Sequence, residues 1–425
     1  MKKKFNNDII FLIGIFLLPF ENFFFAPSFG WATVTPIIFA IYILFNLDIR
    51  KMIEKAKDEK EKKIFYIFIF LILFNLIAFC IVGINIKNFI NACISIGLGF
   101  VNLISMYIYY DKNKSINKVV KLASISYSIT LAIGIIEFIA IKFDIKIIYD
   151  FFNVMFKRNY LKYDRIQFFF TEPSFIGMHI FGILLPLYLF SKDKKVLTLI
   201  IAYSILSVVF KSGVRIIIDI VVICAIFGVY YIISKKKYAL LIVLTIVLGI
   251  FGKIGYDNND RIRKIVDKGI YADGSLASRY FRIQSSVYGY INDFPQVLLG
   301  YGIGNSLKPL RSGYNQAVEK YESTYMREVR ELGDPEFNDD SVTYCLYIRF
   351  ISEFGLIFFI GVLWYLIKIT RESDFKYKWP YLLSVMYIYL QFESYAFYSI
   401  WIYILCMCYT KKLQDTTEKG ELNEK

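Results

Sequence analysis

Long apolar runs alternate with short polar segments along the chain, from the N-terminus almost to residue 410. An α-helix needs about 20 mostly apolar residues to cross a bilayer, and runs of this kind recur too often for a water-soluble core. The pattern predicts twelve transmembrane helices, at residues 8–25, 31–47, 64–84, 89–110, 119–141, 166–190, 196–210, 213–233, 238–252, 342–367, 379–393 and 395–409. The last two share one apolar run, so eleven spans are an alternative.

The polar segments divide the chain into four parts. Residues 1–252 hold predicted transmembrane helices 1–9, 253–340 form one large loop, 341–410 hold helices 10–12, and 411–425 form a polar tail. Within the loop, apolar side chains recur at helical spacing over residues 276–291, which predicts an amphipathic helix lying on the membrane face. These side chains are Leu276, Tyr280, Ile283, Val287 and Tyr290. The expected fold class is an all-α polytopic membrane protein with one long loop outside the membrane.

Lysine and arginine collect in alternate short connections, among them 48–63 and 191–195, and at the N-terminus. Such connections usually face the cytoplasm. With twelve helices, both termini are then cytoplasmic and the 253–340 loop is extracytoplasmic. Long loops obey this rule weakly, so the charges inside the loop do not count against the assignment.

Composition narrows the classes of function. Hydrophobic residues make up 57% of the 425 positions, and the net charge of +14 is spread over many loops rather than gathered in one basic domain. Topology signals and contact with anionic membrane lipids explain such a distribution, so we expect no nucleic-acid partner. None of the six cysteines lies in the long loop, so disulfides and cysteine-bound zinc are not expected. We expect no metal and no cofactor.

Two predicted spans carry an arginine and a carboxylate four residues apart: Arg215 with Asp219, and Arg349 with Glu353. This spacing places each pair on one helix face, where the two side chains can form an ion pair. Each arginine also lies near the predicted outer end of its helix, level with Arg165. Convergence of these guanidinium groups would bind a diphosphate, since arginine contacts phosphate oxygens bidentately.

Further polar residues accompany these arginines. Arg279 and Arg282 of the predicted loop helix are placed to close such a site from above. Glu172 precedes Pro173, where a helix is expected to begin, so Glu172 either caps that helix or belongs to the site. His179, the only histidine, is interpreted as a packed and hydrogen-bonded side chain.

Other isolated features remain open at this stage. Glu21 and Glu137 are intramembrane carboxylates with no assignable partner, suited either to a polar cavity or to helix contacts. The glycines of the 300–304 segment lack the spacing of a dinucleotide fingerprint. They favour a tight turn, with a backbone site for a phosphate or a sugar as the alternative.

The order of these landmarks resembles the O-antigen polymerase and ligase family, Wzy-type polysaccharide polymerases in particular. No single motif is specific, and the resemblance rests on order and placement between about 165 and 360. The landmarks are Arg165, Glu172-Pro173-Ser174, Gly177, Ser212-Gly213-Val214-Arg215, Arg279, Arg282, Pro295, Leu299-Gly300-Tyr301-Gly302-Ile303-Gly304, Asp339-Asp340 and Ile351-Ser352-Glu353-Phe354-Gly355-Leu356.

The resemblance implies a fold related to membrane glycosyltransferases that use lipid-linked donors. It implies transfer of a growing glycan from undecaprenyl diphosphate to another lipid-linked repeat unit, at the outer face of the bacterial cytoplasmic membrane. Donor and acceptor would both be undecaprenyl-diphosphate-linked oligosaccharides, with a flippase and a chain-length regulator as partners. By position, diphosphate binding falls to Arg165, Arg215, Arg279, Arg282 and Arg349, and the catalytic role falls to Asp340 or Glu172.

One departure from the family pattern bears on the reaction. The ligase branch carries a histidine shortly before the helix that follows the loop, and here that place holds Asp339 and Asp340. This difference favours a polymerase over a ligase and leaves the general base unassigned. A transporter or lipid-linked sugar flippase is an alternative, although no matching pair of interrupted helices marks two related halves. An assembly subunit of a surface-polymer complex is another.

Overall fold

The structure is a computed structural model of the chain, and it describes residues 7–21, 33–46, 77–113, 116–156, 166–210, 213–321, 327–333 and 343–409. Every regular element among these residues is a helix, as the sequence predicts. Five of the described helices are long and apolar enough to cross a membrane: Ile86–Asn113, Asn117–Lys142, Pro173–Ser191, Arg215–Ser234 and Ala239–Asp257. The described part of the chain is therefore all-helical and has the features of a membrane-embedded protein.

Shorter apolar helices occupy other predicted spans. These are α1 (Asp8–Leu17), α2 (Thr35–Asn46) and the helix Tyr398–Tyr409. The predicted span 64–84 lies mostly outside the described residues. The count of twelve spans thus stays a prediction.

Aromatic side chains build the core that joins the N-terminal helices. Phe11 of α1 stacks on Phe39 of α2 and on Tyr109 of α5 (Ile86–Asn113), with ring centroids 5.0 and 4.2 Å apart. All three side chains are almost fully buried, and a well-packed aromatic pair contributes about 0.5–1.5 kcal/mol to helix association. Further helices before residue 259 are α6 (Asn117–Lys142), α7 (Lys146–Phe156), α10 (Lys194–Val209), α11 (Val214–Ser234) and α12 (Ala239–Asn258).

The predicted span 166–190 becomes helical only at Pro173. It runs through η2 (Pro173–Phe175), α8 (Ile176–His179), the π-helical turn η3 (Ile180–Leu184) and α9 (Leu185–Ser191). In a regular α-helix the ring of Pro186 would clash with the carbonyl four residues earlier, and the wider π turn relieves this contact. Single π turns inside α-helices often mark functional sites.

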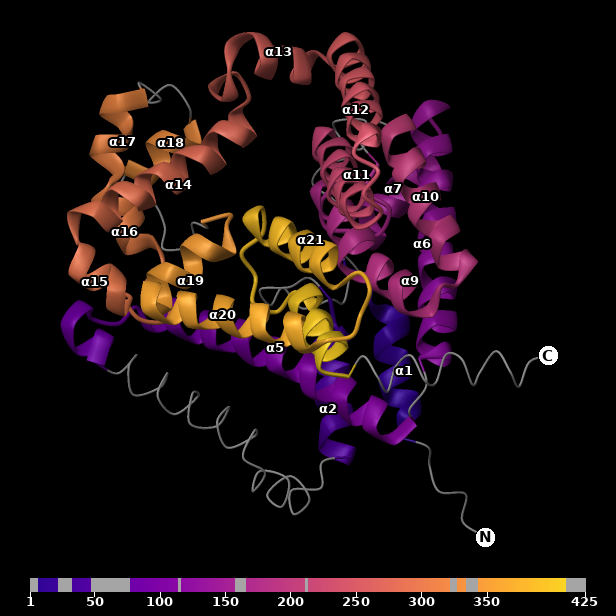
Figure 1. The fold of residues 1–425 in the computed structure, drawn as a ribbon, viewed down its shortest axis with the longest axis horizontal. Coiled ribbons are helices and arrows are strands. Elements are labelled where there is room, and N and C mark those ends of the chain that lie inside the picture. The colour runs from indigo at the N-terminus through magenta and orange to yellow at the C-terminus, as the bar shows by residue number, and fades with distance from the viewer. Residues whose placement is uncertain are drawn as a thin grey trace.

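The described residues of the loop predicted at 253–340 fold into helices with a core of their own. They are α13 (Asp260–Lys268), α14 (Gly274–Asn292), α15 (Phe294–Leu299), α16 (Leu307–Ser312), α17 (Tyr314–Tyr321) and α18 (Arg327–Gly333). Figure 1 shows α13 joining α12 to α14, and α14, α16, α17 and α18 gathered beside each other. Phe281 and Leu310, both 0% exposed, lie in the centre of this loop core.

The helix predicted at 276–291 is α14, but the face it buries differs from the predicted apolar stripe. Its buried face carries Ala277, Phe281, Ser285 and Gly289, whereas Val287 of the predicted stripe is exposed. A Cβ atom at Gly289 would overlap the Pro309 carbonyl of α16. Small residues thus let two helices approach closely, so their packing, rather than apolar periodicity, decides which face is buried.

The predicted span 342–367 is interrupted. It consists of α19 (Leu346–Phe354) and α20 (Leu356–Glu372), separated by Gly355, whose φ of +88° favours glycine. A Cβ atom at Gly300 would lie 2.6 Å from the Gly355 nitrogen, so the glycine turn of the loop packs tightly on this break. The tight-turn interpretation of the 300–304 segment therefore holds.

A second interruption, at residues 391–397, separates α21 (Lys378–Leu390) from the helix Tyr398–Tyr409. Irregular backbone inside a membrane protein must find partners within the protein. Side chains from three helices supply them: Asn102 Nδ2 donates to the Ala396 carbonyl (2.9 Å), Trp401 Nε1 to Tyr395 (2.7 Å) and the Tyr389 hydroxyl to Phe397 (2.9 Å). The interruption is thus a fixed part of the fold.

Candidate functional site

A buried turn places Glu172 at the start of the Pro173 helix. Phe168, 0% exposed, has a positive φ of +55° and packs where a Cβ atom at Gly134 would strike its ring. The Thr171 amide donates to Glu21 Oε2 at 2.9 Å. Glu172 then takes an extended conformation (φ −140°, ψ 151°), as expected before a proline.

The Glu172 side chain does not act as a helix cap. It makes no hydrogen bond to a backbone N–H of the helix start, and its Oε2 accepts a bond from Ser174 Oγ at 2.9 Å. Its charge acts instead on Arg215 of α11. This long-range effect agrees with a place for Glu172 in the site, one of the two roles considered from sequence.

Arg215 and Asp219 occupy the first turns of α11. Asp219 is 4% exposed, and its Oδ1 accepts bonds from the Tyr387 hydroxyl (2.7 Å) and from Gln391 Nε2 (3.3 Å) of the 378–391 region. A Cβ atom at Gly177 would overlap its other oxygen, so only glycine admits the carboxylate here. Asp219 is therefore held in place independently of Arg215.

The ion pair between Arg215 and Asp219 is loose. Nε of Arg215 lies 3.9 Å from Asp219 Oδ2, and this buried nitrogen has no hydrogen-bond partner among the described residues. A buried charged donor without a partner is costly unless a ligand completes it. The charge of Arg279 on α14 also acts on Arg215, so positive charge from two helices accumulates here. This arrangement suits an anion.

Arg279 and Arg282, one turn apart on α14, share one aromatic neighbour. Their Cζ atoms lie 5.3 and 4.8 Å from the centre of the Tyr344 ring. Arg282 is 5% exposed, and its Nε donates to Ser278 Oγ at 3.4 Å. Tyr344 thus gathers both loop arginines that sequence assigned to the site.

Tyr344 itself is held by Glu393, which sequence reasoning did not single out. Glu393 Oε2 accepts bonds from the Thr343 amide (2.5 Å), the Thr343 hydroxyl (2.6 Å) and the Tyr344 amide (2.8 Å). Glu393 lies in the 391–397 interruption, about 50 residues along the chain. The contact between these two segments results from the fold and is not apparent from their positions in the sequence.

Arg349 forms a closed ion pair. Its Nε donates to Glu353 Oε1 at 3.2 Å, and its guanidinium lies 4.7 Å from the Tyr395 ring centre. Glu353 also accepts bonds from the Tyr395 hydroxyl (2.7 Å) and the Gly304 amide (3.3 Å). Every part of this carboxylate is bonded within the protein, so the geometry favours the ion-pair interpretation for Arg349.

The lone histidine belongs to a buried hydrogen-bonded chain. His179 is 0% exposed, with Nε2 2.5 Å from Glu21 Oε1 and Nδ1 2.8 Å from the Tyr127 hydroxyl. This fits the packed role expected from sequence. Sequence reasoning found no partner for Glu21 because the two residues are 158 positions apart. Glu21 also accepts a hydrogen bond from the Thr171 amide, so these hydrogen-bonded side chains contact the turn that carries Glu172.

The candidate site therefore brings together part of the predicted set. The charges of Glu172 and Arg279 act on Arg215, and Arg282 shares the Tyr344 ring with Arg279. Arg165, Asp339 and Asp340 lie outside the described residues. Within the described part of the chain, no group of three or more histidine, cysteine or carboxylate side chains is arranged to hold a metal ion.

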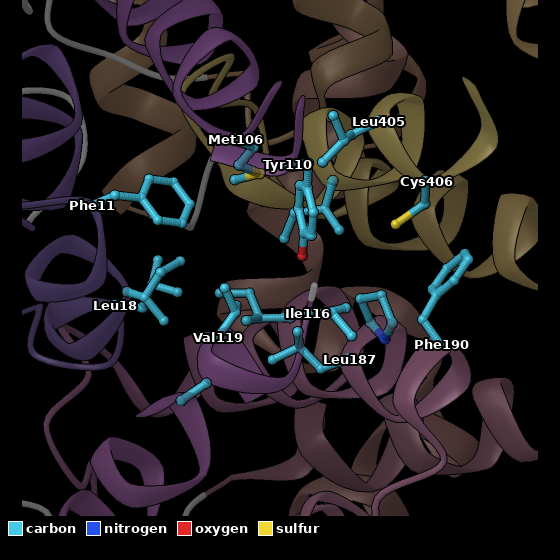
Figure 2. A pocket seen from close by; sticks show the side chains of 15 residues that line it. Phe11, Leu18, Met106, Tyr110, Ile116, Val119, Leu187, Phe190, Leu405 and Cys406 are labelled. Carbon is cyan, nitrogen blue, oxygen red and sulfur yellow. The ribbon is translucent and has the colours of Figure 1, made fainter. Parts of the chain in front are cut away.

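A separate apolar cavity of ≈ 40 Å³ lies elsewhere in the bundle. Figure 2 shows its walls, among them Leu18, Val119, Leu187 and Phe190. Leu187 and Phe190 lie at the end of the Pro173–Ser191 stretch, whereas Glu172 lies at its start, so the cavity is distinct from the arginine site. An apolar cavity of this kind stays dry and offers nothing to a charged substrate.

Comparisons with models of protein families, with curated proteins and with solved structures find no match for this chain.

Proposed function

We propose that the chain is a membrane glycosyltransferase that polymerises undecaprenyl-diphosphate-linked oligosaccharide repeat units into a surface polysaccharide. The proposal places twelve transmembrane helices in the bacterial cytoplasmic membrane, both termini in the cytoplasm and the 253–340 loop outside. The observation that supports it most concerns Arg215. Its buried Nε has no hydrogen-bond partner among the described residues, and the positive charge of Arg279 acts on it. A lipid-linked diphosphate would supply the missing acceptors.

The reaction follows from the chemistry of such a donor. A hydroxyl of the acceptor sugar attacks the anomeric carbon of the donor glycan, a new glycosidic bond forms, and the bond to the diphosphate breaks. Undecaprenyl diphosphate leaves with the electron pair, and Arg215, Arg279 and Arg282 stabilise the negative charge that develops on it. A carboxylate takes the proton of the attacking hydroxyl.

Glu172 and Asp340 are the candidates for that carboxylate. The charge of Glu172 acts on Arg215, and its side chain makes no capping bond, which supports a place in the reaction for it. Asp340 precedes α19 in the chain, and only the family resemblance supports a catalytic role for it. Loss of acid–base assistance lowers turnover by about 10²- to 10⁴-fold. Such a loss in Glu172→Gln with normal turnover in an Asp339→Asn, Asp340→Asn double variant assigns Glu172, and the reverse assigns Asp340.

The proposal is tested by reconstituting the purified chain in vesicles with lipid-linked repeat units. Lengthening of the glycan, without a flippase or a chain-length regulator, is the expected result. Unchanged glycans in vesicles that hold folded protein would contradict it.

A lipid-linked sugar flippase is the second candidate, favoured by one observation. The buried chain of Glu21, His179 and Tyr127 has the residue types of proton relays in transporters. In the same vesicles, a flippase would move the lipid-linked glycan between leaflets and leave its length unchanged. Accessibility of the glycan to a lectin added outside distinguishes the two functions.

A further inference from the structure

Tyr344 has an unusual backbone conformation for its residue type. Its φ is +58°, in the left-handed region that residues other than glycine rarely adopt, at a cost of about 1–3 kcal/mol. Three hydrogen bonds from Thr343 and Tyr344 to Glu393 Oε2, of 2.5 to 2.8 Å, hold the segment there. Strain of this kind persists where surrounding contacts fix it, and it concentrates at functional sites.

Glu393 is itself anchored to the membrane helices. Its backbone carbonyl accepts a bond from Arg349 Nη1 at 3.3 Å, and the neighbouring Phe392 carbonyl accepts one from the Leu346 amide at 3.1 Å. The closed pair of Arg349 and Glu353 therefore supports Glu393. The position of Tyr344 is thus set by α19 and the 391–397 interruption, not by the outer loop.

The Tyr344 ring resolves a difficulty for the loop arginines. Arg279 and Arg282 are like charges one turn apart, and such charges repel. The negative face of an aromatic ring attracts cations, and both guanidinium groups lie within 5.3 Å of this ring centre. The ring therefore attracts both cations, and the charge of one of them, Arg279, acts on Arg215.

We propose that Tyr344, held by Glu393, is a positioning residue that keeps Arg279 and Arg282 together so that the site selects a diphosphate over a monophosphate. The inference rests on the proposed function. A single phosphate is satisfied by Arg215 with one neighbour, whereas the second phosphate of a diphosphate needs a further guanidinium group at a set distance. Separating the loop arginines should therefore weaken diphosphate binding and spare monophosphate binding.

The test uses the full chain in lipid nanodiscs, with farnesyl diphosphate and farnesyl monophosphate as probes that share one tail. The wild type and Tyr344→Phe, which keeps the ring, should bind the diphosphate more tightly than the monophosphate. Tyr344→Leu replaces the ring by a smaller aliphatic side chain and should lower diphosphate affinity about tenfold, with monophosphate affinity changed by less than about twofold. A merely structural role would lower both affinities alike.

Glu393→Gln provides a second variant that retains the ring. It weakens the bonds to Thr343 and Tyr344 and should lower the diphosphate preference in the same direction by a smaller factor. It decides the question if Tyr344→Leu yields no folded protein. An unchanged preference in Tyr344→Leu or, failing that, Glu393→Gln, while Arg215→Lys still loses diphosphate affinity, overturns the inference alone. A wild type with no preference for the diphosphate overturns the proposed function as well.

Discussion

Arg215 with Asp219 in α11 and Arg349 with Glu353 in α19 have the same spacing in sequence and differ in structure. The α19 pair is closed: its Nε to Oε1 distance is 3.2 Å, and Tyr395 and Gly304 complete the carboxylate. The α11 pair is open: its Nε to Oδ2 distance is 3.9 Å, and Tyr387 and Gln391 bond the carboxylate while the arginine Nε stays without a partner among the described residues. The other hydrogen-bond partners of each carboxylate, rather than the spacing of the pair, decide whether an intramembrane arginine is structural or available to a ligand.

The comparison predicts that breaking the closed pair has the largest effect on stability. Arg349→Ala leaves Glu353, which is 1% exposed, as a buried charge without its cation, and should destabilise the protein by about 3–5 kcal/mol. Thermal unfolding in detergent measures this. The double variant Arg349→Met, Glu353→Leu removes both charges and should recover most of the loss. Equal unfolding temperatures for the wild type and Arg349→Ala would refute the closed-pair interpretation.

Breaking the buried hydrogen bonds of Glu21, His179 and Tyr127, beside the turn that carries Glu172, should have the next largest effect on stability. Glu21→Ala leaves His179 Nε2 and the Thr171 amide without their acceptor, and should cost about 2–3 kcal/mol. Tyr127→Phe removes only one hydroxyl and should cost about 1 kcal/mol. Both values come from thermal unfolding. If Tyr127→Phe proves the more damaging, Glu21 does not support the Glu172 turn as described.

The helices of the 253–340 loop should show a smaller, pH-dependent effect. Burial alone would raise the pKa of Asp273, but bonds from Arg261 and the Leu276 amide outweigh it and hold that pKa below its ordinary value. The resulting stability is present above the unfolded pKa near 3.9 and is lost as the pH falls below it. Asp273→Asn keeps a helix cap and should cost about 1 kcal/mol at pH 7.

Hydrogen exchange of α14 amides at pH 7 and at pH 3 measures this difference, which should shrink at the lower pH. Asp260→Asn is the matched control, because its side chain is 86% exposed and its contact with Arg263 spans 3.5 Å. It should have little effect at either pH. A pH-independent cost of Asp273→Asn would exclude the ion pair with Arg261 as its source.

The apolar cavity gives the smallest effect. Val119→Ile adds one methylene group to a space of ≈ 40 Å³ and should stabilise the protein by up to about 0.5 kcal/mol through new van der Waals contacts, without changing activity. Thermal unfolding and polymer yield measure the two parts. A loss of polymer yield would show that the cavity and the arginine site are coupled.

The sequence predictions that the structure confirms depend on interactions between residues close together in the chain. Pro173 starts a helix, Gly300 lies in a tight turn, and the helix at 276–291 forms, because proline, glycine and helical periodicity act over a few residues. The buried face of α14 and the partners of Glu21 depend on residues far along the chain, which one sequence does not pair. The open and closed arginines differ for the same reason, since Tyr387 and Tyr395 are remote in sequence from the residues they bond.

The most direct test replaces the open arginine by lysine. Arg215→Lys keeps the charge and loses the bidentate fork, so polymer formation from lipid-linked repeat units should fall about 10²-fold or more with folded protein retained. Arg371→Lys, on an exposed position of α20, is the matched control and should polymerise as the wild type does. Polymer yield and length in Arg215→Lys equal to those of the control would contradict the account.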